Sequence, residues 1–236
     1  MTFLDAYVSE SDEGFFFSRL QASRFAKQVA DDYNPIHDVE AKRFCVPGDL
    51  LFAYLLTQQG LYPQMTFIFS GMVTDGVALR IENGTEGEWR IVDGRGKEYL
   101  RAAYAGCPNC DPAAVESLVR NYVRFSGHNF PHILQPLMAE KNVMINIDRP
   151  LVIYESMAIH LEKEGIHNPE LVFAGAEMDV EGKRGNAALS FRFLEGGQEV
   201  GTGEKRMVLS GLREYDEEMM NRMIDLYDER KRRKVE

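Results

Sequence analysis

The sequence predicts an α+β fold built from two tandem units, each an antiparallel sheet wrapped around a central helix. Two observations predict it. A series of helix-like and strand-like segments occurs twice, offset by about 103 residues. In each copy a proline, Pro47 or Pro150, opens a stretch that is apolar on nearly all sides. Proline in the first turn and apolar residues all round are typical of a helix buried inside a domain.

The repeat is clearest in the strands. Trp89–Gly94 matches Phe191–Gly196, because each reads aromatic, Arg, two apolar residues, acid, Gly. Phe69–Gly71 matches Phe173–Gly175 in the same order and at a similar offset. An alternative stays open, since any strand that ends in a hairpin turn can carry such a pattern.

The expected elements follow in chain order. The first unit has a short strand, the buried helix and four strands, over residues 14–18, 47–59, 65–70, 76–81, 87–92 and 98–105. The second has a short strand, a helix and three longer strands, over residues 142–146, 150–163, 171–180, 186–194 and 199–210. A helix capped by Asp111 links the units, and a last helix runs from Asp216 to Lys234. We therefore divide the chain into unit 1 (1–111), a linker helix and loop (112–135), unit 2 (136–213) and a C-terminal helix (214–236).

Composition excludes several classes of protein. The net charge of −10 argues against nucleic-acid binding, which needs a basic surface. No apolar run is long enough to cross a membrane, and the N-terminus lacks the charged and apolar regions of a signal peptide. Three cysteines do not make a disulfide framework. We expect a cytoplasmic protein that binds neither nucleic acid nor membrane.

The most informative stretch is Asp31–Asp38, which groups an acid, an amide and an imidazole around a proline. Apolar residues at 22, 25, 26, 29 and 30 predict a helix before it. Asn34-Pro35 favours a turn, because the residue before proline avoids the helical region. A helix followed by this turn would let Asp32 and His37 face one water molecule in general acid–base chemistry. Ordinary turn formation by Asp32 and a structural hydrogen bond from His37 are the alternative reading.

Phe25-Ala26 followed by Asp32-x-Asn34-Pro35-x-His37 resembles the motif of MaoC-like, (R)-specific enoyl-CoA hydratases, the hydratase 2 branch of the hot-dog fold. Residues 41–51 also resemble an uncharacterised bacterial hot-dog-like family, which implies no activity. One helix wrapped by an antiparallel sheet is the hot-dog arrangement, so two units in one chain would make a double hot-dog.

The resemblance implies hydration of a 2-enoyl thioester, or dehydration of a 3-hydroxyacyl thioester, without a cofactor. In that reaction Asp32 and His37 hold and deprotonate the water and deliver a proton to the α carbon. Asn34 holds the loop or the water. The N–H of Gly48, at the start of the buried helix, stabilises the thioester oxyanion. The implied partner is a small-molecule thioester of CoA or of an acyl carrier, and a homodimer of double hot-dogs is left open.

The chain departs from the family pattern around the oxyanion donor. Pro47-Gly48 stands where the family has His-Gly, and the span from His37 to Gly48 is shorter than usual. Asp49 follows Gly48 directly, and a carboxylate there would repel a developing enolate unless it points away. Ala53 and Leu56 occupy positions where the family tends to place a serine.

Two other functions remain open. One is a non-catalytic module that binds an acyl thioester and acts through a partner, which the altered Gly48-Asp49 region favours. The other is a thioesterase, whose hot-dog relatives usually place a carboxylate on the buried helix, where Asp49 or Glu155 would serve. Lys183, Arg184 and Arg192 are candidates to meet phosphates of CoA or of a carrier's prosthetic group, with an ordinary charged surface as the alternative.

A zinc site is a further alternative. Cys107 and Cys110 form a CxxC pair, and His128 and His132 follow with the spacing H-x3-H. The gap between the pairs is longer than a Cys2His2 site prefers, and the intervening sequence predicts a plain helix. We assign no metal, and we leave a redox role for the cysteine pair open.

Overall fold

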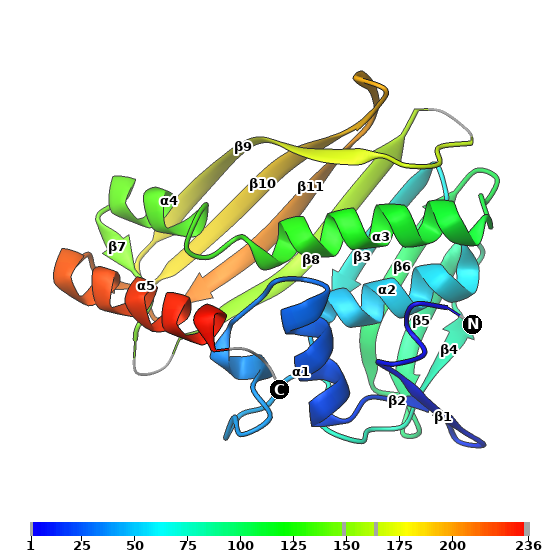
Figure 1. Cartoon of the computed structure of the whole chain (residues 1–236), viewed down its shortest axis with the longest axis horizontal. Helices are drawn as coiled ribbons and strands as arrows, with labels where there is room; N and C mark the ends of the chain where they lie inside the picture. The colour runs from blue at the N-terminus through cyan, green and yellow to red at the C-terminus, as the bar shows by residue number, and fades with distance from the viewer. Residues whose placement is uncertain (1, 148–149, 163–164, 234–236) are drawn as a thin grey trace.

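The structure is a computed structural model that describes residues 2–147, 150–162 and 165–233. Within these residues, ten strands form one antiparallel sheet (Figure 1). In the order in which they lie side by side, the strands are β1 (Ser9–Ser11), β2 (Gly14–Phe16), β4 (Leu79–Asn83), β5 (Glu88–Asp93), β6 (Glu98–Ala105), β3 (Gln64–Phe69), β8 (Val152–Leu161), β11 (Gln198–Ser210), β10 (Arg184–Glu195) and β9 (Glu170–Glu181).

The two halves of this sheet have the same connectivity. In each half the strand that comes first after the helices, β3 or β8, lies beside the last strand, β6 or β11. The halves meet where β3 pairs with β8, with Met65 opposite Ile159 and Phe67 opposite Met157. The sheet is therefore continuous across its two halves, and neither β3 nor β8 is an exposed edge.

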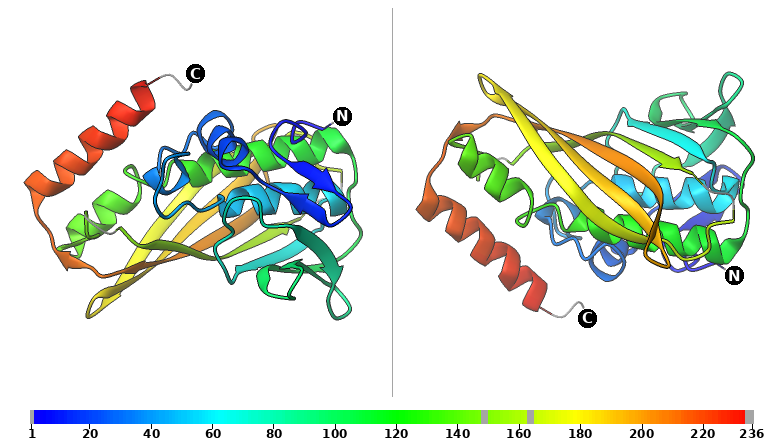
Figure 2. Two further views of the ribbon diagram at one scale, coloured as in Figure 1. Left: turned by 90° about the horizontal axis from the view of Figure 1, so that it is seen from below. Right: turned by 90° about the horizontal axis from the view of Figure 1, so that it is seen from above.

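Two helices, α2 (Gly48–Gln59) and α3 (Pro112–Gly127), lie side by side on one face of the sheet (Figures 1 and 2). The sequence of α2 is apolar nearly all round, and its residues from Asp49 to Leu56 are all buried. In contrast, α3 buries one face against α2 and the sheet, including Leu118, Val119 and Tyr122. It begins where Asp111 caps its first turn, as the sequence predicts.

The helix expected over residues 150–163 is wrong, because β8 occupies this segment. Its residues alternate between the core, with Met157, Ile159 and Leu161 buried, and the outer face, with Ala158 and His160 exposed. That period of two is the strand pattern. The second long helix on this face of the sheet is α3, which lies in the segment that the sequence predicts as a linker helix. Residue 163 lies outside the described residues.

Smaller elements surround the two central helices. They are α1 (Arg19–Gln28), the short helix η1 (Pro35–His37), α4 (Leu134–Glu140), β7 (Val143–Met144), β12 (Arg213–Glu214) and α5 (Glu217–Arg232). The strand expected at residues 142–146 is reduced to β7, which pairs with β12 rather than joining the large sheet. The last helix starts at its cap Asp216 as predicted, and residues 234–236 lie outside the described part.

The helices and the sheet enclose two clusters of buried hydrophobic side chains. One large buried cluster contains the side chains of α2, most of the buried side chains of α3, and inward residues from both halves of the sheet, and a smaller one lies under α4 and α5. No helix among the described residues is long and apolar enough to span a bilayer.

Candidate active site

The loop that carries Asp32 and His37 begins where α1 ends. Ser18 and Gln21 close a capping box at the start of α1. At its other end, the backbone N–H of Asp32 donates to the carbonyl of Ala26 at 2.8 Å, with Asp31 in the left-handed region at φ 53°. This reversal stops the helix and turns the side chain of Asp32 back toward the chain that follows.

Asp32 and His37 face one another, as the motif predicts. The carboxylate Oδ2 of Asp32 lies 3.5 Å from Nε2 of His37, too far for a strong direct hydrogen bond. Their other polar atoms are occupied. Asp32 Oδ1 accepts from the N–H of Asn34 at 2.8 Å, and His37 Nδ1–H donates to the carbonyl of Cys45 at 2.7 Å. Because Nδ1 is engaged with Cys45, Nε2 is the ring nitrogen that faces Asp32.

Asn34 holds the loop rather than facing the pair. Its Oδ1 accepts from the N–H of Ile36 at 3.2 Å and so caps η1, in which Pro35 takes the first position. The backbone of His37 donates to the carbonyl of Asn34 at 3.0 Å, which closes the same turn. Of the two roles the sequence leaves open for Asn34, the structure shows the loop contact.

Gly48 is the first residue of α2 and is half-buried. Pro47 precedes it and offers no side-chain cap, so the N–H groups of the first turn have no side-chain acceptor from that residue. A Cβ atom at Gly48 would come within 3.1 Å of the Phe69 ring and 3.3 Å of the Tyr154 ring. The two rings pack against each other with centroids 4.1 Å apart and lie close to this helix end.

Asp49 does not point toward the solvent side of the helix end. It is only 8% exposed, and its Oδ2 accepts from Ser126 Oγ of α3 at 2.6 Å. Ser126 Oγ in turn accepts from Nζ of Lys205, on β11, at 2.5 Å. The carboxylate that follows the proposed oxyanion donor in the sequence is thus linked through Ser126 to a buried lysine.

Burial raises the pKa of Asp49, and the charge of Lys205 and the hydrogen bond from Ser126 oppose that rise. Burial also lowers the pKa of Lys205, while the carboxylates of Asp49 and Asp32 favour its charged form. Lys205 is 4% exposed, and its ammonium lies 4.1 Å from the ring centroid of Tyr154. Tyr154 and Tyr122 share a hydrogen bond between their hydroxyls, and burial raises the pKa of both.

Sequence reasoning missed Ser126 and Lys205. One signal was available for Lys205. It lies on the inward face of β11, in register with the buried Met207 and Leu209, apart from a bulge between residues 206 and 207. A lysine at a core position of an amphipathic strand is unusual enough to mark a partner or a function. No local signal distinguishes Ser126 from other serines on helices.

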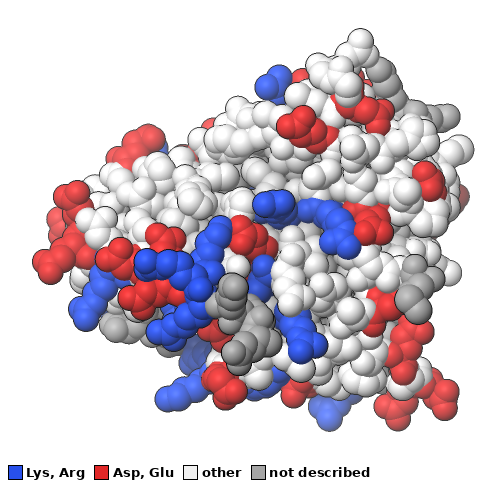
Figure 3. Space-filling model, in the orientation of Figure 1, with Lys and Arg blue, Asp and Glu red and all other residues white. Residues whose placement is uncertain are grey.

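The end of α5 contacts the site loop from outside. Lys231 Nζ and His128 Nε2 each lie 2.6 Å from Oδ2 of Asp31. The carboxylate of Asp38 lies 2.8 Å from Nζ of Lys27 and 3.6 Å from Nε of Arg230. Figure 3 shows Lys and Arg side chains mixed with Asp and Glu in this region. Burial opposes ionisation of Asp31, but the hydrogen bonds from Lys231 and His128 hold its pKa below the usual value.

The structure does not bring the suggested zinc ligands together. Cys107 and Cys110 are exposed before the start of α3, whereas His128 and His132 follow its end. The helix between them has 16 residues and so spans about 24 Å. Within the described part of the chain, no group of three or more His, Cys, Asp and Glu side chains is placed to hold a metal ion.

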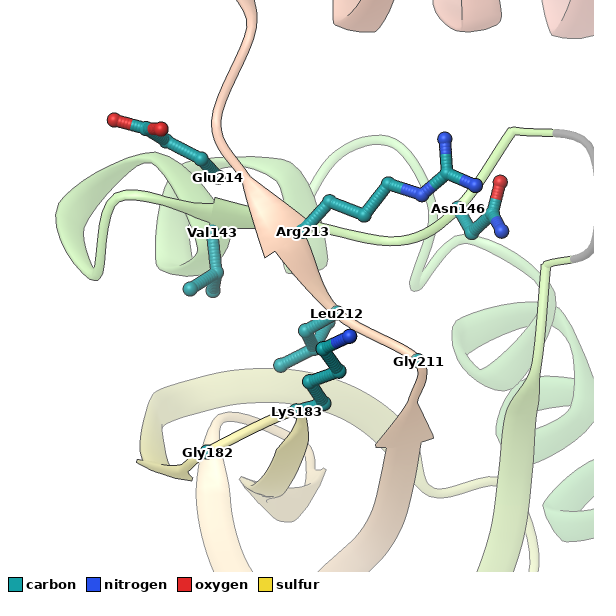
Figure 4. A pocket seen from close by; sticks show the side chains of 8 residues that line it. All are labelled: Val143, Asn146, Gly182, Lys183, Gly211, Leu212, Arg213 and Glu214. Atoms are coloured by element: carbon teal, nitrogen blue, oxygen red, sulfur yellow. The ribbon is translucent and has the colours of Figure 1, made fainter.

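The basic residues suggested for phosphate binding lie elsewhere. Lys183 lines an open cavity of about 530 Å³ between the β9–β10 turn and the β7–β12 pair (Figure 4). In that view the Lys183 side chain points toward Leu212, and Arg213 points toward Asn146. A guanidinium nitrogen of Arg184 lies 3.9 Å from a carboxylate oxygen of Glu155. A guanidinium nitrogen of Arg192 lies 3.3 Å from a carboxylate oxygen of Glu199. Of the two thioesterase candidates, Asp49 lies on the buried helix α2, whereas Glu155 is exposed on β8.

Comparisons with known proteins identify the family of this chain and the type of its fold. A family model described as "Protein of unknown function (DUF3581)" matches residues 2–218. No curated protein matches the sequence. Among solved structures, a conserved protein of unknown function with hot dog fold from Alicyclobacillus acidocaldarius is 10% identical, with a TM-score of 0.50 over 89% of this chain and 98% of that one. This similarity shows a fold of the hot-dog type.

Two further solved structures are more distant. The tesB protein of Mycobacterium avium subs paratuberculosis is 10% identical, with a TM-score of 0.45 over 87% of this chain and 96% of that one. A MaoC-like dehydratase is 9% identical, with a TM-score of 0.45 over 87% of this chain and 98% of that one. Neither similarity is strong enough to transfer an activity.

Proposed function

We propose that this chain, which belongs to the DUF3581 family of proteins of unknown function, adds water to a 2-enoyl thioester or removes water from a 3-hydroxyacyl thioester. Asp32 and His37 are the acid–base pair of this reaction. The observation that carries the proposal is their separation of 3.5 Å, with the second polar atom of each side chain already engaged by the loop backbone. The pair is fixed in orientation and yet leaves Oδ2 and Nε2 for a third group.

A water molecule bound to both atoms can be activated without a metal. In hydration, the pair takes one proton as the water O–H bond breaks and the oxygen bonds to C3 of the enoyl group. The same pair then returns a proton to C2, so that no net proton is gained or lost. The hydrogen bond from Nδ1–H to Cys45 keeps Nε2 available for these transfers.

Negative charge develops on the thioester oxygen during this addition, and a donor must stabilise it. The N–H of Gly48 is our candidate, because it lies at the N-terminus of a twelve-residue helix whose preceding residue supplies no side-chain cap. Asp49 is turned toward Ser126 and Lys205, so its carboxylate is balanced rather than left facing the oxyanion. The contact of Asp49 Oδ2 with Ser126 supports the proposal against the objection that the sequence raises.

We also propose that the two repeats are two hot-dog units, which makes the chain a double hot-dog with one Asp32–His37 pair. The shared connectivity of the two sheet halves supports this reading. The second half then contributes α3, β8 and β11 to the walls of the site rather than a second active site.

A second candidate function is binding of an acyl thioester without turnover. The packing at Gly48 favours it, because the Phe69 and Tyr154 rings crowd the first residue of α2. Hydration requires those rings to move aside or to flank the thioester, whereas a binding module needs only a groove for the acyl chain.

The test uses 2-enoyl-CoA thioesters of short, medium and long acyl chain with the 236-residue chain. Loss of enoyl-thioester absorbance reports hydration, and a thiol reagent reports hydrolysis in parallel. We expect absorbance loss without thiol release, and no absorbance loss with Asp32→Asn. Thiol release by wild type that Asp49→Asn abolishes would replace the proposal with a thioesterase. Binding by calorimetry without any turnover would favour the binding module.

A further inference from the structure

The residue just before Asp32 has an unusual backbone conformation. Asp31 has a φ of 53°, and Asn142 is the only other non-glycine residue with a positive φ in the part of the chain that the structure describes. The left-handed region is disfavoured for residues with a Cβ atom, so such a conformation persists where surrounding contacts hold it. Whatever holds Asp31 therefore also sets the direction in which the site loop, residues 31–38, leaves α1.

Two helices from distant parts of the chain hold this turn. At the end of α3, His128 Nε2 lies 2.6 Å from Oδ2 of Asp31. From α5, Lys231 Nζ lies 2.6 Å from the same oxygen, and the Tyr227 hydroxyl donates to the backbone carbonyl of Asp31 at 3.4 Å. The side chain and the backbone of Asp31 are thus both in contact with α5.

The last turns of α5 also contact the middle and the far end of the site loop (Figure 1). The buried ring of Tyr227 packs edge-on against the rings of Tyr33, in the loop, and Phe130. Arg230 Nε lies 3.6 Å from Oδ2 of Asp38, the residue that ends the loop. One stretch of α5 therefore spans the loop from its first residue to its last.

Around Tyr227, α5 is otherwise open to solvent. Residues 225, 226, 228 and 229 are exposed. The other buried residue of the helix, Met220, lies in its first half and belongs to the smaller core cluster. Because exposed ion pairs contribute little by themselves, we take the packing of Tyr227 as the anchor and the ion pairs as contacts that fix its orientation.

We infer that the C-terminal half of α5 is a clamp on the site loop, made of Tyr227, Arg230 and Lys231. Tyr227 and Lys231 are positioning residues that hold Asp31 in its left-handed conformation. The clamp thereby keeps Asp32 turned toward His37. Its catalytic meaning rests on the proposed function, but the ordering of the loop does not require turnover.

A clamp and a general stabiliser predict different responses. If α5 only stabilises the fold, weakening its contacts speeds the opening of all core elements together. If it clamps the site loop, weakening the same contacts loosens the loop while α2 stays protected. The rate at which individual segments exchange their amide hydrogens separates the two.

The experiment is amide hydrogen exchange of the 236-residue chain, followed by mass spectrometry under conditions in which every variant stays folded. The reporters are the hydrogen-bonded amides of the site loop, which are those of Asp32, Asn34, Ile36, His37 and Asp38. We expect them to exchange at least about fivefold faster in Tyr227→Ala and in Lys231→Met, while the amides of α2 keep their wild-type rates.

Conservative variants and neighbouring residues provide the controls. Tyr227→Phe keeps the ring packing, and Lys231→Arg keeps a cation that can pair with Asp31, so the loop should exchange at rates close to wild type in both. Leu226→Ala and Arg232→Met change the adjacent residues of α5. Leu226 is 41% exposed, and Arg232 Nε donates to a carbonyl within the same helix, so neither change should affect the loop.

A double-mutant cycle tests whether Lys231 acts through Asp31. Glycine adopts a positive φ without the cost of a Cβ atom, so the loop of Asp31→Gly does not need the clamp to reach this conformation. Adding Lys231→Met to Asp31→Gly should therefore not speed the exchange of the loop any further. Effects of the two changes that multiply would contradict a route through Asp31.

Two results would overturn the clamp. One is an unchanged loop in folded Tyr227→Ala and Lys231→Met, and the other is faster exchange by the same factor in the loop and in α2. If Tyr227→Ala does not fold, Lys231→Met decides, together with its rescue by Lys231→Arg.

Hydration of a 2-enoyl-CoA is measured on the same variants. We expect kcat to fall about threefold to tenfold with KM nearly unchanged, because the acid–base pair is displaced while the binding surface is kept. Faster loop exchange in the variants with no turnover by wild type would reject the hydratase and keep the clamp. Turnover by wild type with unchanged loop exchange in the variants would reject the clamp and keep the hydratase.

Discussion

Asp32, Asn34 and His37 lie within one short loop, and their geometry is largely encoded by local rules. Proline restricts the residue before it, and an Asn side chain at that position caps the following turn. The sequence therefore predicts that Asp32 and His37 face each other, and the structure places them 3.5 Å apart. Such local rules cannot predict contacts between residues that are far apart in the sequence. Asp49 and Ser126 are 77 residues apart in the chain, and Ser126 and Lys205 are 79 apart.

The role of Asn34 leads to a prediction at this scale. Asn34→Ala removes the acceptor for the Ile36 N–H, loosens η1 and should lower hydratase kcat/KM by roughly 10- to 100-fold through misplacement of His37. Asn34→Ser keeps a capping oxygen and should retain most of the activity. Steady-state kinetics of the two variants provide the comparison. Equal losses in both would show that the amide itself contacts the water or the substrate.

At the scale of elements, hydrophobic pattern alone does not separate a buried helix from a buried strand. Residues 152–161 are apolar enough to suggest a helix, yet they form β8, which pairs with β3 on one side and β11 on the other. The sequence thus predicts the strands of the second half but misassigns its helix. Those partner strands come from distant parts of the chain, so the pairing is not visible in a single segment.

The contact between α3 and the site loop gives a second prediction. A Cβ atom at Gly127 would lie 1.9 Å from the carbonyl oxygen of Ala30, so Gly127→Ala must push α3 away from the end of α1. We expect a loss of about 1–3 kcal/mol in the free energy of unfolding, measured by urea denaturation. Gly94→Ala is the matched control, because a Cβ there meets no atom within 4 Å. Equal stability of the two variants would mean that the helix end is not packed as described.

At the scale of the whole molecule, α5 connects the C-terminal end of the chain to the site loop near its beginning. Tyr227 is 5% exposed, and its ring packs edge-on against the ring of Tyr33 with the two centroids 6.0 Å apart. Lys231 pairs with Asp31. The amphipathic pattern predicts the helix itself. Its docking on the Asp31–Asp38 loop could not be predicted, because it depends on ion pairs between residues about 200 positions apart.

The Asp31–Lys231 pair predicts a pH dependence of stability. Because the pKa of Asp31 is lowered in the folded protein, its pairing stabilises the fold above the ordinary value of 3.8 and loses that effect as the pH falls through the lowered pKa. Wild type should therefore exceed Lys231→Met in stability at pH 7 by about 1 kcal/mol or less, and the difference should shrink as the pH falls below 3.8 and through the lowered pKa of Asp31. Thermal unfolding across this pH range measures it, with Lys141→Met as the control at an exposed pair. A difference that persists unchanged at low pH would contradict the ion pair.

The most direct test of the central claim is a double-mutant cycle at Asp32 and His37 with a 2-enoyl-CoA substrate that wild type turns over. Each single variant, Asp32→Asn or His37→Ala, should lower kcat/KM at least about 100-fold, since a positioned acid–base group contributes on that scale. Because the two side chains act on one water molecule, the double variant should be about as slow as the slower single variant. Losses that multiply in the double variant, or single variants that keep wild-type activity, would contradict the account.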